Sequence, residues 1–409
     1  MHAPEFNNLF MATETLENWL FSKLQQSNVT QRSLDELSLL TVVIPSYGRQ
    51  DFLLRQCVYW QGSGAVVLIV DGSPKPLEER VQSMISGLGD IKYLHSATSV
   101  MDRLKQASKL IDTRYTVMLG DDEFLLFSGL RSAINLLEKN HELVACIGQS
   151  LHYYLSDDGS KCSYGKGYDT FRYEIKQDHV QDRLNSSMKD YNAATCYAVT
   201  RSSIWGRSWG NLQEFSSAYV FELEHALVTY IWGKLGSVDD VYWMRSSENP
   251  PTSTADTNRS LSTEDWWTYA KYKTEQVNFV TKLGDELMSA QQIDRVTAEA
   301  MISYAVGVYL QDTNHTGSSF FHKKCRQFAL SVLKKWLPEI WVGRMKQLRC
   351  RLKPAKPKAL VIGNFGNLAD LKAKKTPLPF LFNEELVADL SAMEKLIADF
   401  YMARSVQSK

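Results

Sequence analysis

The sequence predicts an α/β fold in which a mostly parallel β-sheet is covered by helices on both faces. Two kinds of segment alternate along its first half: continuous apolar runs of strand length, and stretches whose apolar residues recur at helical spacing. The strand-length runs lie at 41–44, 65–70, 115–119 and 143–147. The helical segments lie at 51–59, 77–85, 99–111 and 128–138. Uninterrupted apolar strands are typical of parallel sheets, because such strands are buried on both faces.

A helix is expected before the first strand. Leu16, Trp19, Leu20 and Leu24 recur at intervals of three and four residues, which places them on one face of a helix. An apolar face of this kind packs against the rest of the fold. We therefore assign residues 1–37 to an N-terminal helical segment.

The character of the chain changes near residue 250. A polar stretch at 250–263 leads into segments of helical period with little strand signal. In the last of them Asn383 is a suitable N-cap. A single apolar stripe follows, made of Leu386, Leu390, Met393, Ile397 and Phe400. The sequence therefore predicts an α/β domain over 38–250 and a mainly helical C-terminal domain over 255–409.

The composition excludes several classes of protein. A chain of 409 residues with 44% hydrophobic content and 11 prolines is folded and long enough for two domains. Its 46 basic and 46 acidic residues give no overall charge that would favour nucleic acid. The six cysteines contain no Cys-x-x-Cys pair, so we expect reduced thiols and a cytoplasmic protein. No signal peptide and no apolar run of membrane-spanning length is apparent.

Three polar clusters follow three of the strand-length runs. They are Pro45-Ser46-Tyr47-Gly48-Arg49, Asp71-Gly72-Ser73 and Gly120-Asp121-Asp122-Glu123. The carboxyl ends of parallel strands meet at one edge of the sheet, where ligands bind. Taken singly, each cluster is also explained as a turn or a helix cap. Their common position favours a site in which acids hold a cation on a diphosphate, Tyr47 faces a base and Asp71 accepts hydrogen bonds from base or ribose.

Together these three segments resemble the nucleotide-sugar-binding half of the family 2 glycosyltransferases, which have the Rossmann-like GT-A fold. The resemblance covers about 40–250. It implies a nucleotide-sugar donor whose nucleotide pocket is lined by Pro45, Tyr47 and Asp71, with Arg49 beside them. It also implies that Asp122 is the final acid of an Asp-x-Asp motif that binds Mg²⁺ or Mn²⁺ on the diphosphate, with Asp121 in the middle position.

The sequence departs from the family pattern at two positions that bear on the metal. Gly120 stands where the first Asp is usual, and Arg245 ends a segment where many members place a metal-binding His. Fewer anionic ligands would hold the ion more loosely, or cationic side chains would replace it. Arg103 and Lys105 are candidates to neutralise diphosphate, although helices also carry solvated Arg and Lys.

A later segment supplies a candidate general base. Residues 221–227 resemble the family's Glu-Asp-x-x-Leu helix, and this alignment places Glu222 on the acid that acts as base in inverting members. A carboxylate is needed there to take the proton of the attacking sugar hydroxyl. Glu224 points about 200° around the helix from Glu222, so only one of them faces the site, and we choose Glu222. His225 is expected to be structural or to lie near the acceptor.

Aromatic residues are frequent in the middle of the chain, and most are expected in the core. Trp205, Trp209 and Tyr191 are candidates for contact with an acceptor sugar. Between 323 and 358 the chain carries 12 basic residues and one acid, interleaved with apolar residues. This pattern fits either a helix on an anionic membrane surface or a solvated basic face on a packed helix.

The sequence thus predicts an inverting glycosyltransferase that moves a sugar from a nucleotide-sugar donor to a glycan or lipid-linked acceptor. The resemblance implies a role in bacterial surface polysaccharide biosynthesis. We expect a cytoplasmic protein, with the basic stretch at 323–358 as a candidate for peripheral contact with the inner face of the cytoplasmic membrane. Two alternatives are a nucleotidyltransferase and a non-catalytic nucleotide- or glycan-binding module. A nucleotidyltransferase normally has a Gly-rich, Arg-containing phosphate loop after its first strand, which 45–49 matches poorly. Nucleic acid is not an expected partner.

Overall fold

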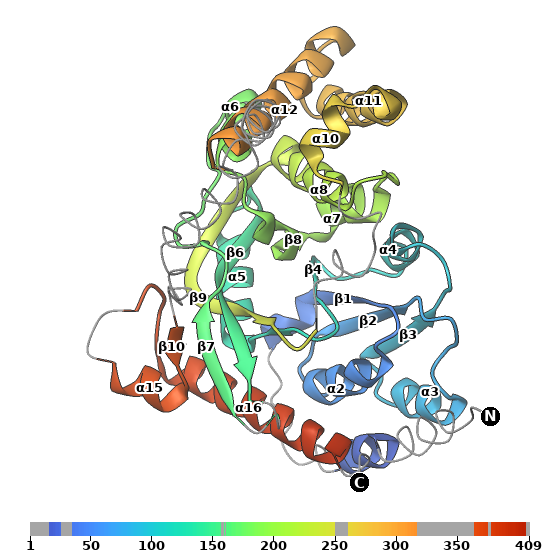
Figure 1. Cartoon of the computed structure of the whole chain (residues 1–409), viewed down its shortest axis with the longest axis vertical. Coiled ribbons are helices and arrows are strands. Elements are labelled where there is room, and N and C mark those ends of the chain that lie inside the picture. Colours follow the sequence, from blue (N-terminus) through green and yellow to red (C-terminus); the bar gives the residue numbers. More distant parts are fainter. Residues whose placement is uncertain are drawn as a thin grey trace, which may run out of the picture.

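A computed structural model describes residues 16–25, 35–156, 159, 161–249, 261–316, 364–374 and 378–405 (Figure 1). The strands are β1 (Leu40–Ser46), β2 (Val66–Asp71), β3 (Ile91–His95), β4 (Tyr115–Met118), β5 (Phe124–Leu125), β6 (Leu143–Leu155), β7 (Cys162–Lys166), β8 (Val199–Arg201), β9 (Lys234–Ser246) and β10 (Asn364–Gly366). The α-helices are α2 (Gln50–Trp60), α3 (Glu79–Ser86), α4 (Val100–Ser108), α5 (Phe127–Lys139), α6 (Val180–Lys189), α7 (Ser202–Arg207), α8 (Ala218–Trp232), α10 (Thr263–Thr268), α11 (Lys273–Gln291), α12 (Arg295–Thr316), α15 (Leu368–Ala373) and α16 (Glu384–Ser405). Another helical segment spans residues 16–25.

The strands form one sheet with the order β10-β7-β6-β8-β4-β1-β2-β3. The half made of β4, β1, β2 and β3 is parallel, because β1 pairs in parallel with both β2 and β4, and β2 with β3. β8 is antiparallel to β4 and to β6, whereas the long β9 runs parallel to β6. β9 then leaves β6 to pair with β5 in the antiparallel sense. This α/β architecture with a mostly parallel sheet confirms the fold class that the sequence predicts.

Helices cover both faces of the parallel half because alternate strand residues point to opposite sides. In β1, Val42 and Ile44 lie in the core cluster that includes α2 and α3. Val43 lies instead in a second cluster with Met101 and Leu104 of α4. Both sides are fully apolar, which explains why β1 and β2 appear in the sequence as uninterrupted apolar runs. The edge strand β3 is less buried and was not recognised from its sequence.

The two ends of the described chain pack together. Leu16 and Leu20 of the N-terminal helix are buried, and Trp19 contacts Phe400 of α16 with ring centroids 5.7 Å apart. Lys23 forms an ion pair of 2.6 Å with Asp399. The N-terminal helix therefore packs on the fold as predicted, with α16 as part of its partner surface. Figure 1 shows α16, in red, crossing beneath the sheet beside this helix.

The chain after the sheet contributes to two places. Helices α10, α11 and α12 gather near α6 and α8 at one end of the molecule (Figure 1). Strand β10 extends the sheet beside β7, and α16 packs on α5 and α2. Within the described residues, the C-terminal part is thus mainly helical and reaches across the 250–255 division to the sheet. No helix of the described residues is both long and apolar enough to span a bilayer.

Two other predictions concern the cysteines and the basic stretch. Cys57, Cys146, Cys162 and Cys196 are buried and unpaired, as the sequence predicts. The basic stretch at 323–358 lies outside the described residues.

Candidate active site

The three strand-end clusters meet at one edge of the sheet, as the sequence predicts. In the parallel register Ser46 lies beside Asp71, and the amide of Gly72 donates to the carbonyl of Ser46 at 2.9 Å. The hydroxyl of Ser46 donates to Asp121 Oδ2 at 2.7 Å. Pro45 sits in β1 directly before this contact, where it is half-buried. Residues far apart in the chain therefore form a single polar edge of the sheet, made of 45–49, 71–73 and 120–123. We call it the acid edge.

Asp71 stabilises this edge through buried hydrogen bonds. Its side chain is fully buried, and Oδ1 accepts hydrogen bonds from the amide and the hydroxyl of Ser73 at 2.8 and 2.5 Å. Oδ2 accepts from Gln50 Nε2 at 2.7 Å and from the Tyr93 hydroxyl at 2.8 Å. Asp71 thus binds protein donors in this structure, where the sequence predicts base or ribose donors. Tyr47, by contrast, is 65% exposed and presents an open aromatic face.

An arginine already neutralises the paired acids. Arg49 lies 2.9 Å from Asp121 Oδ1 and 3.2 Å from Asp122 Oδ2, with its own side chain partly exposed. Burial raises the pKa of Asp121 to about 6, against the opposing effect of Arg49. Asp122 Oδ2 also accepts a hydrogen bond from Asn249 Nδ2 at 2.8 Å. The acid pair is therefore held by cationic and amide donors of the chain itself.

Glu123 and Gly120 explain the departure from the family motif. A Cβ placed on Gly120 would lie 3.0 Å from Glu123 Oε2, so the glutamate carboxyl occupies space that a side chain at 120 would need. Trp243 Nε1 donates to the same oxygen at 2.9 Å. Burial first and the neighbouring Asp122 second raise the pKa of Glu123 to about 8. Glu123 is therefore a largely protonated group near neutral pH.

The residues at this edge do not fit a divalent-metal site built from protein ligands. Mg²⁺ and Mn²⁺ need several oxygen ligands, preferably anionic ones. Asp121 and Asp122 are bridged by Arg49, and Glu123 is directed to Trp243. Within the described part of the chain no group of three or more His, Cys, Asp or Glu side chains surrounds a common point.

Glu222 stands apart from the other acids. It lies near the start of α8 and is half-buried, and within the described residues it accepts no hydrogen bond. Burial raises its pKa from 4.5 to about 7, while nearby Arg245 opposes the shift. Both Glu222 and Glu123 act electrostatically on Tyr168 and Tyr197, which places all four side chains in one region. Glu222 is thus an unengaged carboxylate close to the acid edge.

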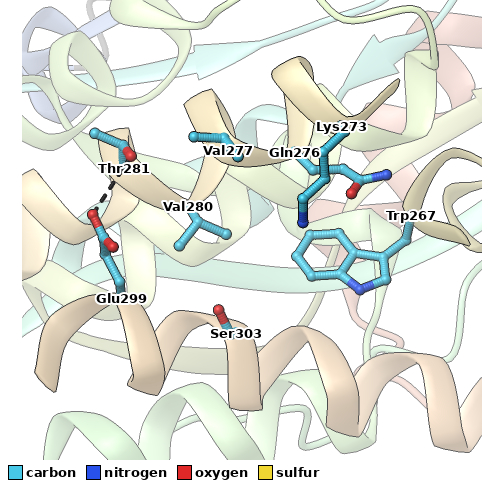
Figure 2. Close-up of a pocket in the computed structure, with 8 residues that line it drawn as sticks. All are labelled: Trp267, Lys273, Gln276, Val277, Val280, Thr281, Glu299 and Ser303. Atoms are coloured by element: carbon cyan, nitrogen blue, oxygen red, sulfur yellow. Dashed lines mark hydrogen bonds between the residues drawn. The ribbon is translucent and has the colours of Figure 1, made fainter. Parts of the chain in front are cut away.

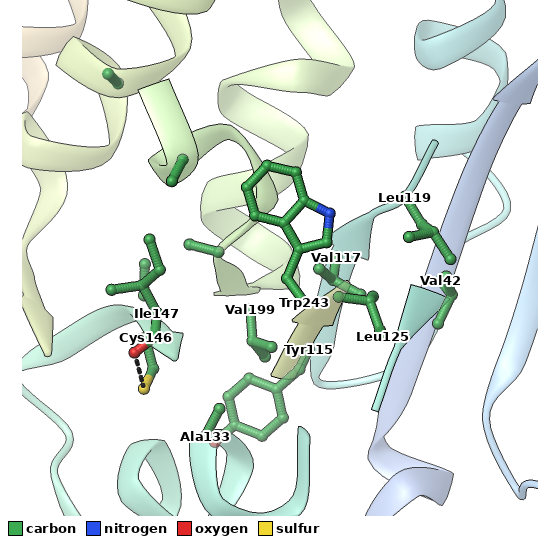
Figure 3. Packing of buried hydrophobic residues seen from close by; sticks show 14 of the residues in the cluster. Val42, Tyr115, Val117, Leu119, Leu125, Ala133, Cys146, Ile147, Val199 and Trp243 are labelled. Carbon is green, nitrogen blue, oxygen red and sulfur yellow. Dashed lines mark hydrogen bonds between the residues drawn. The ribbon is translucent and has the colours of Figure 1, made fainter. Parts of the chain in front are cut away.

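Strand register brings Arg245 to the same place. Phe124 pairs with Met244 and Leu125 with Trp243 in the antiparallel β5–β9 ladder, so continuing that ladder sets Glu123 opposite Arg245. Alternation along the strand then puts Trp243 and Arg245 on one face. Figure 3 shows the Trp243 indole packed above the core beside Val117.

An aromatic stack supports this arginine. Tyr197 lies against one side of Trp243 with centroids 4.0 Å apart and an interplanar angle of 20°. Tyr168 stacks on Trp243 as well, at 5.5 Å and 11°. The guanidinium of Arg245 lies over the Tyr168 ring, 5.0 Å from its centroid. Sequence inspection missed this group because only the fold brings its members together.

Glu224 and His225, neighbours of Glu222, have structural roles. Glu224 is fully buried and paired with Lys282 of α11, and one of its oxygens accepts from the Gln213 amide at 3.3 Å. His225 is buried against Trp209 with ring centroids 4.4 Å apart, and burial lowers its pKa to about 3. The structure thus directs Glu224 into a buried contact with α11, and Glu222 as the base stays a prediction.

The two cationic candidates differ in position, and only Arg103 is corrected by it. Arg103 is 4% exposed, and its Nη1 donates to the carbonyls of Ser46 and Val70 at 2.6 Å each. It lies so close beneath Gly72 that a Cβ there would overlap the guanidinium. Arg103 is therefore scaffold and cannot reach a diphosphate in front of the loop. Lys105 is a partly exposed residue of α4 that lies 3.9 Å from Asp102 on its own helix.

Two of the acceptor candidates are also corrected. Trp205 and Trp209 are 1% and 2% exposed and belong to the apolar cluster beneath α4, because both faces of that part of the sheet need cover. Tyr191 is partly buried and packs on Tyr309 with centroids 5.5 Å apart. Glu222 acts electrostatically on both of these tyrosines, so they remain near the candidate base.

A buried ion pair supports the acid edge from behind. Arg55 is fully buried and bidentate to Glu248, with Nη1–Oε1 and Nη2–Oε2 distances of 2.8 and 2.9 Å. Its Nη2 and the Tyr153 hydroxyl both donate to the backbone carbonyl of Asp122, at 3.0 and 2.6 Å. Tyr401 of α16 donates to Glu248 at 2.7 Å. Nothing in the local sequence of these residues indicates that they meet.

A separate pocket of about 280 Å³ lies between α11 and α12. Figure 2 shows Trp267 and Lys273 at one end and the Thr281–Glu299 pair at the other. Its lining includes none of the residues that form the acid edge. The candidate active site is therefore the edge itself and the region around Glu222.

Comparisons with known proteins give only distant structural matches. No family model matches the chain, and no curated protein matches it. Among solved structures, S. aureus TarS matches with a TM-score of 0.37 and 13% identity, over 67% of this chain and 53% of that one. TarS 1-349 in complex with UDP-GlcNAc matches with a TM-score of 0.41 and 11% identity, over 69% of this chain and 93% of that one. This chain thus spans about half the length of the first of these chains, and likeness at this level assigns it no activity.

Proposed function

We propose that this protein is an inverting glycosyltransferase of the family 2 type, which transfers a sugar from a nucleotide-sugar donor to a glycan or lipid-linked acceptor. The observation that carries the proposal is Glu222, a half-buried carboxylate with a pKa raised to about 7 beside an edge of strand-end acids. A general base works best when its pKa lies near the operating pH. The role in surface polysaccharide assembly is part of the proposal and rests on the sequence resemblance.

The arrangement divides the reaction between two groups of residues. Tyr47 presents an exposed ring for stacking by the base of the nucleotide, and the edge formed by 45–49, 71–73 and 120–123 borders the diphosphate. Glu222 accepts the proton of the acceptor hydroxyl as its oxygen attacks the anomeric carbon. The bond from that carbon to the diphosphate oxygen breaks in the same step, and the electron pair leaves with the nucleoside diphosphate.

The two alternatives make different products. A nucleotidyltransferase would exchange pyrophosphate, and a binding module would release nothing. Glu222 favours the transferase over the binding module, because a site that only binds has no need for a carboxylate with a near-neutral pKa.

The test is release of nucleoside diphosphate from a panel of UDP-, GDP- and ADP-sugars, with candidate glycan acceptors present. Glu222→Gln retains size and hydrogen bonding but cannot take a proton. We expect it to lower turnover by on the order of 10²-fold or more while donor affinity stays nearly unchanged. Pyrophosphate exchange, or a product with retained anomeric configuration, would contradict the proposal.

A further inference from the structure

We propose that Arg245 binds the diphosphate of the donor and that donor binding requires no divalent metal. The inference deepens the proposed function and rests on it. The residues of the acid edge do not fit a divalent-metal site, because Arg49 already lies between Asp121 and Asp122. A second source of positive charge is then needed for a dianionic diphosphate, and continuing the β5–β9 register by one residue past Phe124–Met244 sets Arg245 opposite Glu123.

Arg245 is held in a fixed position by its neighbours. Its guanidinium rests on Tyr168, which stacks on Trp243, and Trp243 is anchored by its hydrogen bond to Glu123. An arginine held on an aromatic face loses less conformational entropy when it binds an anion. The aromatic stack therefore prepares the guanidinium fork for a planar, bidentate contact with phosphate oxygens.

The N–H groups of Arg245 are also unengaged, which sets it apart from the other arginines near the edge. The guanidinium groups of Arg49, Arg55 and Arg103 are all bound to carboxylates or backbone carbonyls. Arg245 is half-buried, yet within the described residues it has no carboxylate within 4.0 Å and no hydrogen-bond acceptor. A desolvated cation without an anionic partner is costly, and an anionic ligand removes that cost.

The groups that face Arg245 leave room for this role. Glu222 and Glu123 lie within electrostatic range, but neither forms an ion pair with it. His152 pairs with Arg245 in the β6–β9 register, and burial and then Arg245 lower its pKa to about 4, so it is neutral. During transfer the phosphate charge grows from about −2 to −3 as the bond to the anomeric carbon breaks. A guanidinium at this position stabilises the leaving group as that charge develops.

The proposal is tested by titrating the intact protein with UDP, GDP and ADP and with the matching nucleosides, in excess EDTA and in Mn²⁺. We expect the preferred nucleoside diphosphate to bind equally well in EDTA. Arg245→Ala should weaken that binding roughly 10- to 100-fold, the range of a lost charge-assisted bidentate contact. Binding of the nucleoside should stay unchanged, because it carries no phosphate. Arg245→Lys should recover part of the loss.

A matched control is Arg207→Ala. Arg207 also stacks on an indole, 4.0 Å from the Trp232 centroid, but it pairs with Glu286 away from the acid edge. The Arg207→Ala variant should bind the nucleoside diphosphate with unchanged affinity. Unchanged diphosphate affinity of Arg245→Ala, or binding that EDTA abolishes, would overturn this inference and leave the proposed function standing. Failure of the intact protein to bind any nucleoside diphosphate would overturn both.

Discussion

At the scale of single residues, the two buried glutamates of α8 have different roles: Glu224 is structural and Glu222 is the candidate base. Glu222 and Glu224 are both desolvated, and burial raises the pKa of each. Only Glu224 has a partner, Lys282, which fixes it as a link between α8 and α11. Glu222 has no hydrogen-bond or ion-pair partner within the described residues, so the charge of nearby Arg245 offsets only part of the cost of its burial. A group that destabilises the protein in this way is typical of a functional site.

The pKa of Glu222 predicts the pH dependence of the reaction. A general base acts only when it is ionised, so kcat/KM should rise with pH through about 7 and then level off. The rising limb should be absent in Glu222→Gln. Initial rates between pH 5.5 and 8.5, with the acceptor well below its KM, measure this. A rate independent of pH over that range would remove Glu222 from the proton transfer.

The same shift predicts a change in stability of the opposite sense. The folded pKa of about 7 lies above the ordinary 4.5, so Glu222 favours the folded state only while protonated, and this contribution is lost as pH rises from 4.5 to 7. Glu222→Gln should therefore be more stable than the parent at pH 8 by roughly 1–3 kcal/mol, and no more stable at pH 4.5. Urea unfolding at both pH values measures the difference. Equal gains at the two values would contradict the assigned pKa.

Glu224→Gln is the matched variant on the same helix. It leaves Lys282 without its counter-charge in a buried contact, and we expect a loss of stability of about 3–5 kcal/mol. Turnover per folded molecule should change little, because Glu224 lies away from the site. Comparison of unfolding free energies and rates for the two variants separates the roles. If Glu224→Gln lowered the rate as much as Glu222→Gln, both substitutions would act by displacing α8, and Glu222 would lose its role as the base.

At the scale of elements, the periodicity of the sequence predicts the sheet well where burial is two-sided. β1, β2 and β4 coincide with the predicted runs at 41–44, 65–70 and 115–119 to within two residues at each end, because a strand covered on both faces needs uninterrupted apolar residues. β3 was missed because an edge strand is only partly covered. The first half of the long β9 is missing from the predicted runs, since it is polar and half-exposed.

The sequence predicts the acid edge for the same reason, but not the residues that reach it by antiparallel pairing. Asp121 and Asp122 directly follow a parallel strand, so topology alone brings them to Ser46 and Asp71. Arg245 arrives through the register of β9 against β5, which no local pattern encodes. Arg55 and Glu248 are 193 positions apart in sequence and meet only once the sheet and α2 are in place.

The Arg55–Glu248 ion pair is expected to stabilise the structure behind Asp122 more than the Tyr401–Glu248 hydrogen bond does. Glu248→Gln leaves a fully buried guanidinium without a counter-ion, and we expect a cost of about 3–5 kcal/mol. Tyr401→Phe removes one neutral donor to the same ionised carboxylate and should cost about 1.5–3 kcal/mol. Urea unfolding of the two variants measures these costs. Equal costs would contradict this prediction, because the ion pair would then contribute no more to stability than the hydrogen bond from Tyr401.

At the scale of the whole molecule, α16 closes the fold. It covers the face of the sheet opposite to Trp243, because Phe124 and Met244 point to that side of the β5–β9 ladder and lie in one apolar cluster with its stripe. The same helix contacts the N-terminal segment through Phe400, and through Tyr401 it contacts Glu248, whose partner Arg55 donates to the Asp122 carbonyl. The predicted stripe of α16 is thus confirmed as its buried face, and it joins both ends of the described chain to the candidate site.

Removal of α16 is therefore predicted to unfold the protein, not merely to shorten it. Leu390, Met393, Ile397 and Phe400 are each 0% exposed. At about 1.5–3 kcal/mol for each buried side chain, their loss amounts to roughly 6–12 kcal/mol, comparable with the whole stability of about 5–15 kcal/mol of a typical domain. A chain that ends at Lys374 should lack a cooperative thermal transition and be digested rapidly by protease.

Point variants on α16 keep this prediction falsifiable if the shortened chain proves insoluble. Phe400→Ala should cost about 3–5 kcal/mol, because the ring fills a core position against Trp19 and Phe52. Lys395→Ala changes an exposed residue of the same helix and should alter stability by no more than about 0.5 kcal/mol. Urea unfolding compares the two. If both variants melt like the parent, α16 covers the sheet without contributing to its stability, and the candidate site does not depend on the C-terminal end of the chain.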